Sequence, residues 1–145
     1  MRAAVETSAA EAAGREAPHA FRACDLASTP PRSGDLLCAT RASTARIVRF
    51  DELAQALDAR AGQAFPMHCE LVVRADEGGD AKLESIGGNV VQSVTLSRMT
   101  LNARKLLGSA YIARDAAAAD CARGAPPCRG HLTRRPWLVL LQFRH

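Results

Sequence analysis

The stretch that decides the fold is residues 67–94, MHCELVVRADEGGDAKLESIGGNVVQSV. A run rich in β-branched residues is followed by a glycine-containing turn at residues 76–80 and by a second run. Gly78 and Gly79 supply the backbone freedom that a tight two-residue turn needs. The pattern therefore predicts a β-hairpin with these two glycines at its tip.

The predicted hairpin brings two polar side chains together. With Gly78 and Gly79 as the loop, Glu77 faces Asp80, and counting outward places His68 opposite Asn89. A register slip of one residue would separate the imidazole from the amide.

This pair has a specific chemical meaning. An imidazole acts as a general base near neutral pH when a neighbouring acceptor holds one ring nitrogen protonated and directs the other at a nucleophile. The Asn89 carbonyl is the expected acceptor, so His68 and Asn89 are the candidate catalytic residues. The alternative is an ordinary strand histidine and an asparagine that follows two glycines.

Composition limits the size and the partners of the protein. The 145 residues suffice for one domain, and 48% apolar but only 4% aromatic content predicts a core of modest volume. The formal charge is +4, but the arginines are scattered and few aromatics lie among them. We therefore expect no nucleic-acid partner.

Neither a membrane span nor a signal peptide is visible. The longest apolar run, residues 137–141, is far too short to cross a bilayer. The first residues lack the hydrophobic centre of a signal peptide. The chain as written is expected in the cytoplasm, or in the periplasm or outside the cell if an upstream signal peptide was lost with the N-terminus.

The first half of the chain reads as helix, loop, strand and helix. The Ala- and Glu-rich residues 2–14 predict a helix, residues 18–33 a loop, and residues 34–39 a short buried strand. Residues 50–61 form the clearest helix, with Asp51 as the expected N-cap and Gly62 as the stop.

The second half reads mainly as strands. Residues 90–97 are predicted to form a further strand after a bend at Gly87 and Gly88, and residues 109–124 have a helical middle followed by a loop. Residues 137–144 are a strand that should be covered on both faces. The order predicts an α+β fold, with an N-terminal helix and one central helix on a mostly antiparallel sheet. Residues 1–20 are the Ala-rich helix and linker, and residues 21–145 a single domain.

Five cysteines are distributed along the chain. Cys121 and Cys128 could close a small disulfide loop or remain thiols; with His131 they could also form part of a zinc site, but no second Cys-x-x-Cys pair completes it. We therefore predict neither a metal nor a cofactor. Cys38 is expected to be a small buried residue, and Cys24 to lie in a loop. Cys69 follows His68 on a strand and so points to the opposite face, where His68 cannot activate it.

The order Gly34-Asp35-Leu36, then His68 at the start of a strand, then Ile86-Gly87-Gly88-Asn89-Val90 resembles the papain-like NlpC and CHAP amidohydrolase superfamily. More closely it resembles the bacterial domain-of-unknown-function family numbered 2272, placed in that superfamily. The resemblance implies hydrolysis of amide bonds, commonly in cell-wall peptides, by a nucleophile at the N-terminus of a helix. It assigns His68 as the base and Asn89 as the polar residue that orients it.

The resemblance leaves the nucleophile without a candidate. The helix that should carry it would precede Met1, and Ser8 lies among alanines in the middle of the first helix. We therefore expect a domain truncated at its front, with part of the sheet uncovered. Three classes remain open: an incomplete hydrolase, a non-catalytic remnant that binds a peptide or cell-wall fragment, and a small basic binding protein unrelated to hydrolysis.

Overall fold

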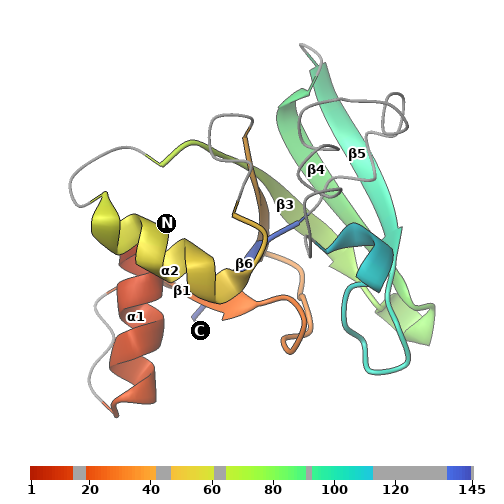
Figure 1. Ribbon diagram of the computed structural model, residues 1–145. Coiled ribbons are helices and arrows are strands. Elements are labelled where there is room, and N and C mark those ends of the chain that lie inside the picture. The colour runs from red at the N-terminus through yellow and green to blue at the C-terminus, as the bar shows by residue number, and fades with distance from the viewer. Residues whose placement is uncertain (15–18, 42–46, 61–64, 91–92, 113–136, 145) are drawn as a thin grey trace.

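The computed structural model describes residues 1–14, 19–41, 47–60, 65–90, 93–112 and 137–144. Within these residues two α-helices, α1 (Arg2–Ala12) and α2 (Phe50–Ala59), accompany one six-stranded sheet (Figure 1). The strands are β1 (Phe21–Asp25), β2 (Leu36–Thr40), β3 (Met67–Ala75), β4 (Lys82–Val90), β5 (Ser93–Thr100) and β6 (Val139–Phe143). The predicted α+β class is confirmed.

The sheet has the order β1-β6-β2-β3-β4-β5, and each neighbouring pair is antiparallel. The last strand of the chain thus lies between the first two. Residues 139–142 of β6 are all buried, which confirms the prediction of a strand covered on both faces. Such a strand can tolerate apolar side chains on both sides because neither face meets water.

Two apolar layers cover the sheet. On one face α1 and α2 pack over β1, β6 and β2, where Ala4 and Ala10 of α1 and Leu53 and Leu57 of α2 are buried. The opposite face carries a second cluster, built around Trp137. Its other buried members are Leu26, Leu37, Ala39, Val72, Leu83, Met99, Leu101, Leu107 and Leu140.

None of the described helices is long and apolar enough to span a bilayer.

The central hairpin forms, but its tip differs from the prediction. The last strand pair is Ala75 with Leu83, and a short 3-10 turn, η2 (Glu77–Gly79), occupies the tip instead of a two-residue turn. A bulge between Val72 and Arg74 then shifts the register, so that Leu71 pairs with Ile86. Leu71 and Ile86 are paired in the predicted register. The tip shifts the strand pairs next to it by one residue, and the bulge in β3 cancels that shift.

Three further predictions about local structure were wrong. Residues 21–25, expected in a loop, form β1, because they pair with β6 at the sheet edge. The N-cap of α2 is Arg49 rather than Asp51, and the Glu52 carboxylate accepts the Arg49 backbone N–H at 3.3 Å. Gly87 and Gly88 do not separate two strands, since β4 continues through both glycines to Val90, with a register shift against β5 between Gly87 and Val90.

Two other predicted elements have bounds close to those of the structure, and part of one more lies outside the described residues. The helix at residues 2–14 and the strand at residues 34–39 correspond to α1 and β2. Ser109–Tyr111 forms a 3-10 turn, η3, at the start of the segment with helical composition. Residues 113–136, with Cys121, Cys128 and His131, fall outside the described part of the chain.

Candidate functional site

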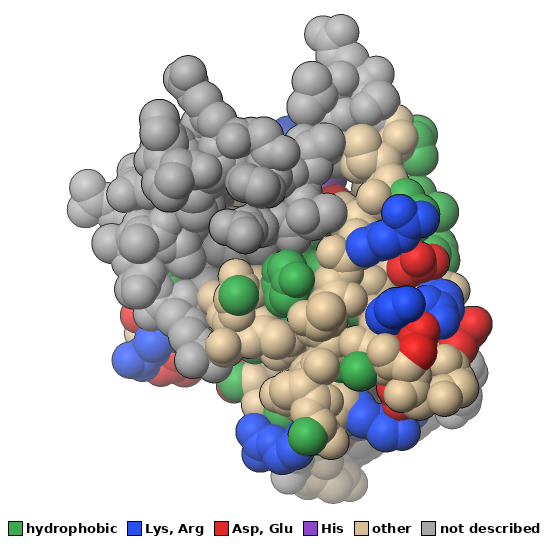
Figure 2. Space-filling model, turned by 90° about the vertical axis from the view of Figure 1, so that its right-hand side faces the viewer, with side chains coloured by type: hydrophobic (Ala, Val, Ile, Leu, Met, Phe, Trp, Pro, Cys, Tyr) green, Lys and Arg blue, Asp and Glu red, His purple; other side chains and the backbone are tan. Residues whose placement is uncertain are grey.

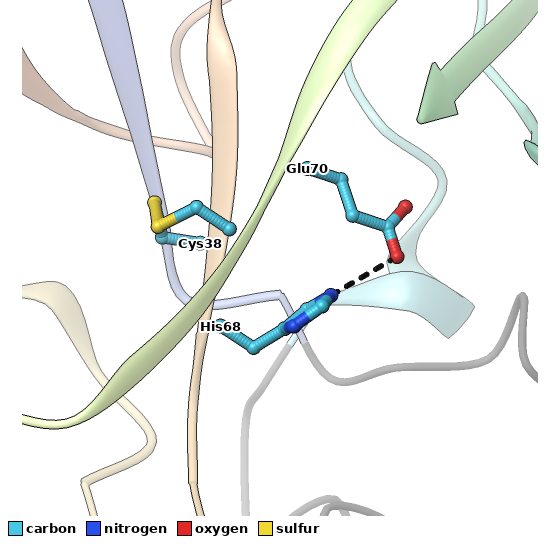
Figure 3. The surroundings of a disulfide bond; sticks show 4 residues. Cys38, His68 and Glu70 are labelled. Atoms are coloured by element: carbon cyan, nitrogen blue, oxygen red, sulfur yellow. Dashed lines mark hydrogen bonds and ion pairs between the residues drawn. A yellow bond between two sulfur atoms is a disulfide. The ribbon is translucent and has the colours of Figure 1, made fainter. Parts of the chain in front are cut away.

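The candidate site is built on β3. His68 and Glu70 are two residues apart on a strand, so both side chains project from the same face of the sheet. The His68 Nε2 atom lies 3.3 Å from the Glu70 Oε1 atom, and the two residues are only 6% and 1% exposed. Figure 3 shows the imidazole turned toward this carboxylate. The structure therefore contains a buried histidine–carboxylate pair.

The neighbouring strand completes the environment of the carboxylate. Ser85 of β4 donates a hydrogen bond from its hydroxyl to the Glu70 Oε2 atom at 2.7 Å. Both carboxylate oxygens of Glu70 thus have partners, as a buried acid requires. His68, Glu70 and Ser85 form a continuous polar chain across two strands.

These contacts set the charge of Glu70. Burial acts to raise the pKa of the carboxyl, but hydrogen bonds from His68 and Ser85, together with the Ser97 hydroxyl, act in the opposite direction. The net pKa lies below the ordinary value for a glutamate. Glu70 is therefore ionised near neutral pH and accepts hydrogen bonds through both oxygens.

The ring of His68 is also packed. It stacks on the indole of Trp137, with a centroid separation of 6.3 Å and an interplanar angle of 29°. Trp137 is fully buried and directs its Nε1–H at the Met99 sulfur, 3.2 Å away. Because packing on one side and Glu70 on the other restrict rotation, the imidazole has a defined orientation.

The predicted site residues have different outcomes. His68 occupies the inner face of β3, and the described pairs of β3 with β4 run from Ala75–Leu83 to Leu71–Ile86 without reaching His68 and Asn89, so the predicted pairing of these two residues stays a prediction. The backbone of Asn89 belongs to β4, but its side chain lies outside the described part of the structure. Its role in orienting His68 therefore stays a prediction.

Glu70 was not among the site residues predicted from the sequence. The signal was present, because alternation along a strand places residue 70 on the same face as residue 68. An acidic side chain between apolar neighbours on a strand is, however, equally typical of a residue that faces water. The structure identifies Glu70 as the acceptor that the imidazole contacts.

The cysteines also differ from expectation. Cys38 of β2 and Cys69 of β3 are paired across the two strands and form a disulfide. Cys38 is fully buried, as predicted, but its bond to Cys69 was not foreseen, because the pairing of β2 with β3 is not visible in the local pattern. Cys24 lies on β1 rather than in a loop and is a free thiol, and burial raises its pKa.

The Gly-Asp-Leu motif has a structural role. Asp35 is buried, and its carboxylate accepts hydrogen bonds from the Arg32 backbone N–H at 2.8 Å and from the Gln142 amide at 3.1 Å. These bonds join the turn before β2 to the end of β6. Asp35 thus helps to hold β6 between its neighbours.

Other features do not add to the site. A cavity of about 550 Å³ near the start of α2 is lined by Asp25, Arg49, Phe50 and Leu138, among others, but not by His68 or Glu70. Across the described residues, no group of three or more His, Cys, Asp or Glu side chains is arranged to hold a metal ion.

Comparison with protein families gives one match. Residues 3–143 match the model of an uncharacterised protein family conserved in bacteria, domain of unknown function 2272. The chain belongs to this family. The match covers nearly the whole sequence, so the His68–Glu70 pair lies inside the family domain. Curated proteins and solved structures give no match to this member of the family.

Proposed function

We propose that this protein carries the acid–base part of a papain-like site that hydrolyses amide bonds, with His68 as the general base. The observation that supports the proposal is the buried contact between His68 and Glu70, with Ser85 on the second carboxylate oxygen. A carboxylate that orients an imidazole is the third member of catalytic triads on several unrelated folds. Glu70 thus takes the orienting role, and Asn89 stays a second candidate for it.

In this proposal the route of the proton starts from the contact between Nε2 of His68 and Glu70. With Nε2 protonated and donated to Glu70, the Nδ1 atom carries the lone pair of the neutral ring. Nδ1 would remove the proton of a thiol or hydroxyl as that group attacks the amide carbon, and would return the proton to the leaving amine. The ionised Glu70 stabilises the imidazolium that forms between these steps.

The nucleophile is the part that the described residues do not provide. Within them, no Ser, Thr or Cys side chain makes a hydrogen bond to His68. The Cys38–Cys69 disulfide lies on the other side of β3. The proposal therefore requires a nucleophile from another segment of the protein.

The test uses two forms of the protein, this chain and one extended upstream to the next in-frame start. Both are assayed for release of peptides from cell-wall fragments, with H68A and E70Q variants and the exposed E77Q exchange as a matched control. We expect activity in the form that contains the nucleophile, loss of about 10²-fold or more in H68A and E70Q, and no change in E77Q. Activity that is unaffected by H68A would overturn the proposal.

A non-catalytic function is the second candidate. It is favoured by the same absence of a nucleophile in contact with His68 among the described residues. The protein would then bind a peptide or cell-wall fragment. Calorimetry with defined muropeptides would show binding by a form that has no hydrolytic activity, and H68A would weaken that binding.

The disulfide also supports a location. Disulfides persist in oxidising compartments such as the periplasm or the extracellular space and are rare in the cytoplasm. We propose that the protein functions in such a compartment. Because Cys38 is buried in the folded protein, cells are lysed directly into a denaturant that contains the alkylating agent; mass spectrometry would then show Cys38 and Cys69 unmodified if this is correct and alkylated if the protein is cytoplasmic.

A further inference from the structure

The half of the sheet far from the helices exposes aliphatic side chains. Leu71, Ile86 and Leu96 pair across β3, β4 and β5 and are 44%, 41% and 45% exposed. Val94 shares their face and is 75% exposed. Figure 2, seen from the β5 side, shows hydrophobic side chains at the surface next to a group of charged ones. A row of this kind is typical of an interaction surface.

This row ends at a sheet edge. β5 is the terminal strand of the sheet and lies at its far end from α1 and α2 (Figure 1). The Leu101 N–H bonds to the Ala81 carbonyl, so odd-numbered residues of β5 direct their backbone groups toward β4. Even-numbered residues direct theirs outward, as the Thr100 carbonyl does when it accepts the Gly108 N–H at 3.0 Å.

Farther along the strand, the described part of the chain supplies no such partner strand for the outward backbone groups. The segment around Leu107 and Gly108 covers the edge at residues 100 and 101. Among the described residues, no strand pairs with the outward groups of Val94 and Leu96. Residues 93–97 also contain no lysine, proline or other charged residue of the kind that commonly blocks an exposed edge.

We propose that β5 pairs with β5 of a second copy of this protein, antiparallel and about a two-fold axis at Thr95. In this register Val94 of each copy faces Leu96 of the other, and both residues use their outward backbone groups. The contact joins two six-stranded sheets edge to edge and extends the aliphatic row through the interface. It adds an assembly to the proposed function and does not depend on it.

The alternative registers are less favourable. An axis at Leu96 would place Val94 against Arg98, and an axis at Ser97 would place Leu96 against Arg98. The Ser97 register would also bring Val94 opposite Thr100, whose carbonyl is already bonded to Gly108. Arg98 is better accommodated where it is, with its Nε atom 3.1 Å from the Glu84 carboxylate of the same copy. The Leu96 axis still pairs the two Leu96 side chains, but only the axis at Thr95 places both Val94 and Leu96 of each copy opposite an aliphatic residue.

The test measures mass and backbone protection in the intact protein. Light scattering over a range of concentrations should show a dimer, and the V94K variant should raise the dimer dissociation constant about tenfold or more, since it places a cation at both ends of the contact. The control T100K changes an exposed residue of the same strand that pairs with Lys82 of its own copy and, in this register, faces no residue of the second copy's β5. It should leave the dimer unchanged.

Hydrogen exchange tests the register without any substitution. The Val94 and Leu96 amides should exchange slowly at high protein concentration and faster on dilution, because the partner strand accepts their hydrogen bonds. A wild-type protein that is monomeric throughout would overturn the proposal. So would a dimer that V94K does not weaken, or one in which these two amides exchange equally fast at all concentrations, since it would use another surface.

Discussion

Gly87 of β4 lies directly against the side chain of Glu70. A Cβ atom at residue 87 would come within 2.6 Å of the Glu70 Cγ and 2.7 Å of its Oε1. Glutamate side chains are flexible, but this one is buried and bonded at both oxygens, to His68 and to Ser85. The absence of a side chain on β4 thus leaves the space through which the carboxylate reaches the imidazole.

We expect G87A to disturb the His68–Glu70 pair. The added methyl would force Glu70 from its place, at a cost of about 1–3 kcal/mol in the free energy of unfolding. G88A is the matched control, because a Cβ there meets no atom within 4 Å. Urea unfolding of both variants would measure the difference. Equal stability of G87A and G88A would mean that Glu70 has another position of similar energy.

Stability should depend on the ionisation of Glu70. Its pKa in the folded protein is lowered, so its contribution is fully present above the unfolded value of about 4.3 and is lost as the pH falls through the folded pKa. We expect E70Q to cost about 1–3 kcal/mol at pH 7, with the difference from wild type becoming smaller below about pH 4. The exposed E77Q exchange is the control. A pH-independent difference would show that Glu70 does not change its protonation on unfolding.

The Cys38–Cys69 disulfide should stabilise the fold. It joins residues 31 positions apart, and the constraint on the unfolded chain predicts a contribution of about 2–4 kcal/mol. Reduction by dithiothreitol should therefore lower the thermal midpoint of the wild-type protein. In a variant with both Cys38→Ala and Cys69→Ala, the same reductant should have no effect. A midpoint that reduction leaves unchanged in the wild type would contradict the prediction.

Trp137 should be a major contributor to stability. It is fully buried, stacks on His68 and contacts Met99 through its Nε1–H. We expect W137A to cost about 3–5 kcal/mol and W137F clearly less, because phenylalanine keeps most of the ring volume. Chemical unfolding followed by circular dichroism would measure both. Equal losses would show that the Nε1–H contact, rather than the volume, dominates.

The candidate site was only partly accessible from the sequence. His68 was identified because its chemistry is distinctive and because alternation places it on one face of a predicted strand. Glu70 was not, because the same alternation reads equally well as an acidic residue facing water. Which face of β3 is buried depends on Trp137, Val72 and Met99, which come from three different segments of the chain.

Local sequence periodicity determined the α+β class, the two helices and the central hairpin, since these depend on spacings of two or about four residues. The tertiary structure decided the place of β6 between β1 and β2, the Cys38–Cys69 disulfide and the burial of Glu70. These features arise from pairing between distant segments, which is selected by the burial of the whole sheet. The hairpin depends on both local sequence and tertiary structure. The two glycines determine where the chain turns, and a bulge in β3 determines how the two strands are paired.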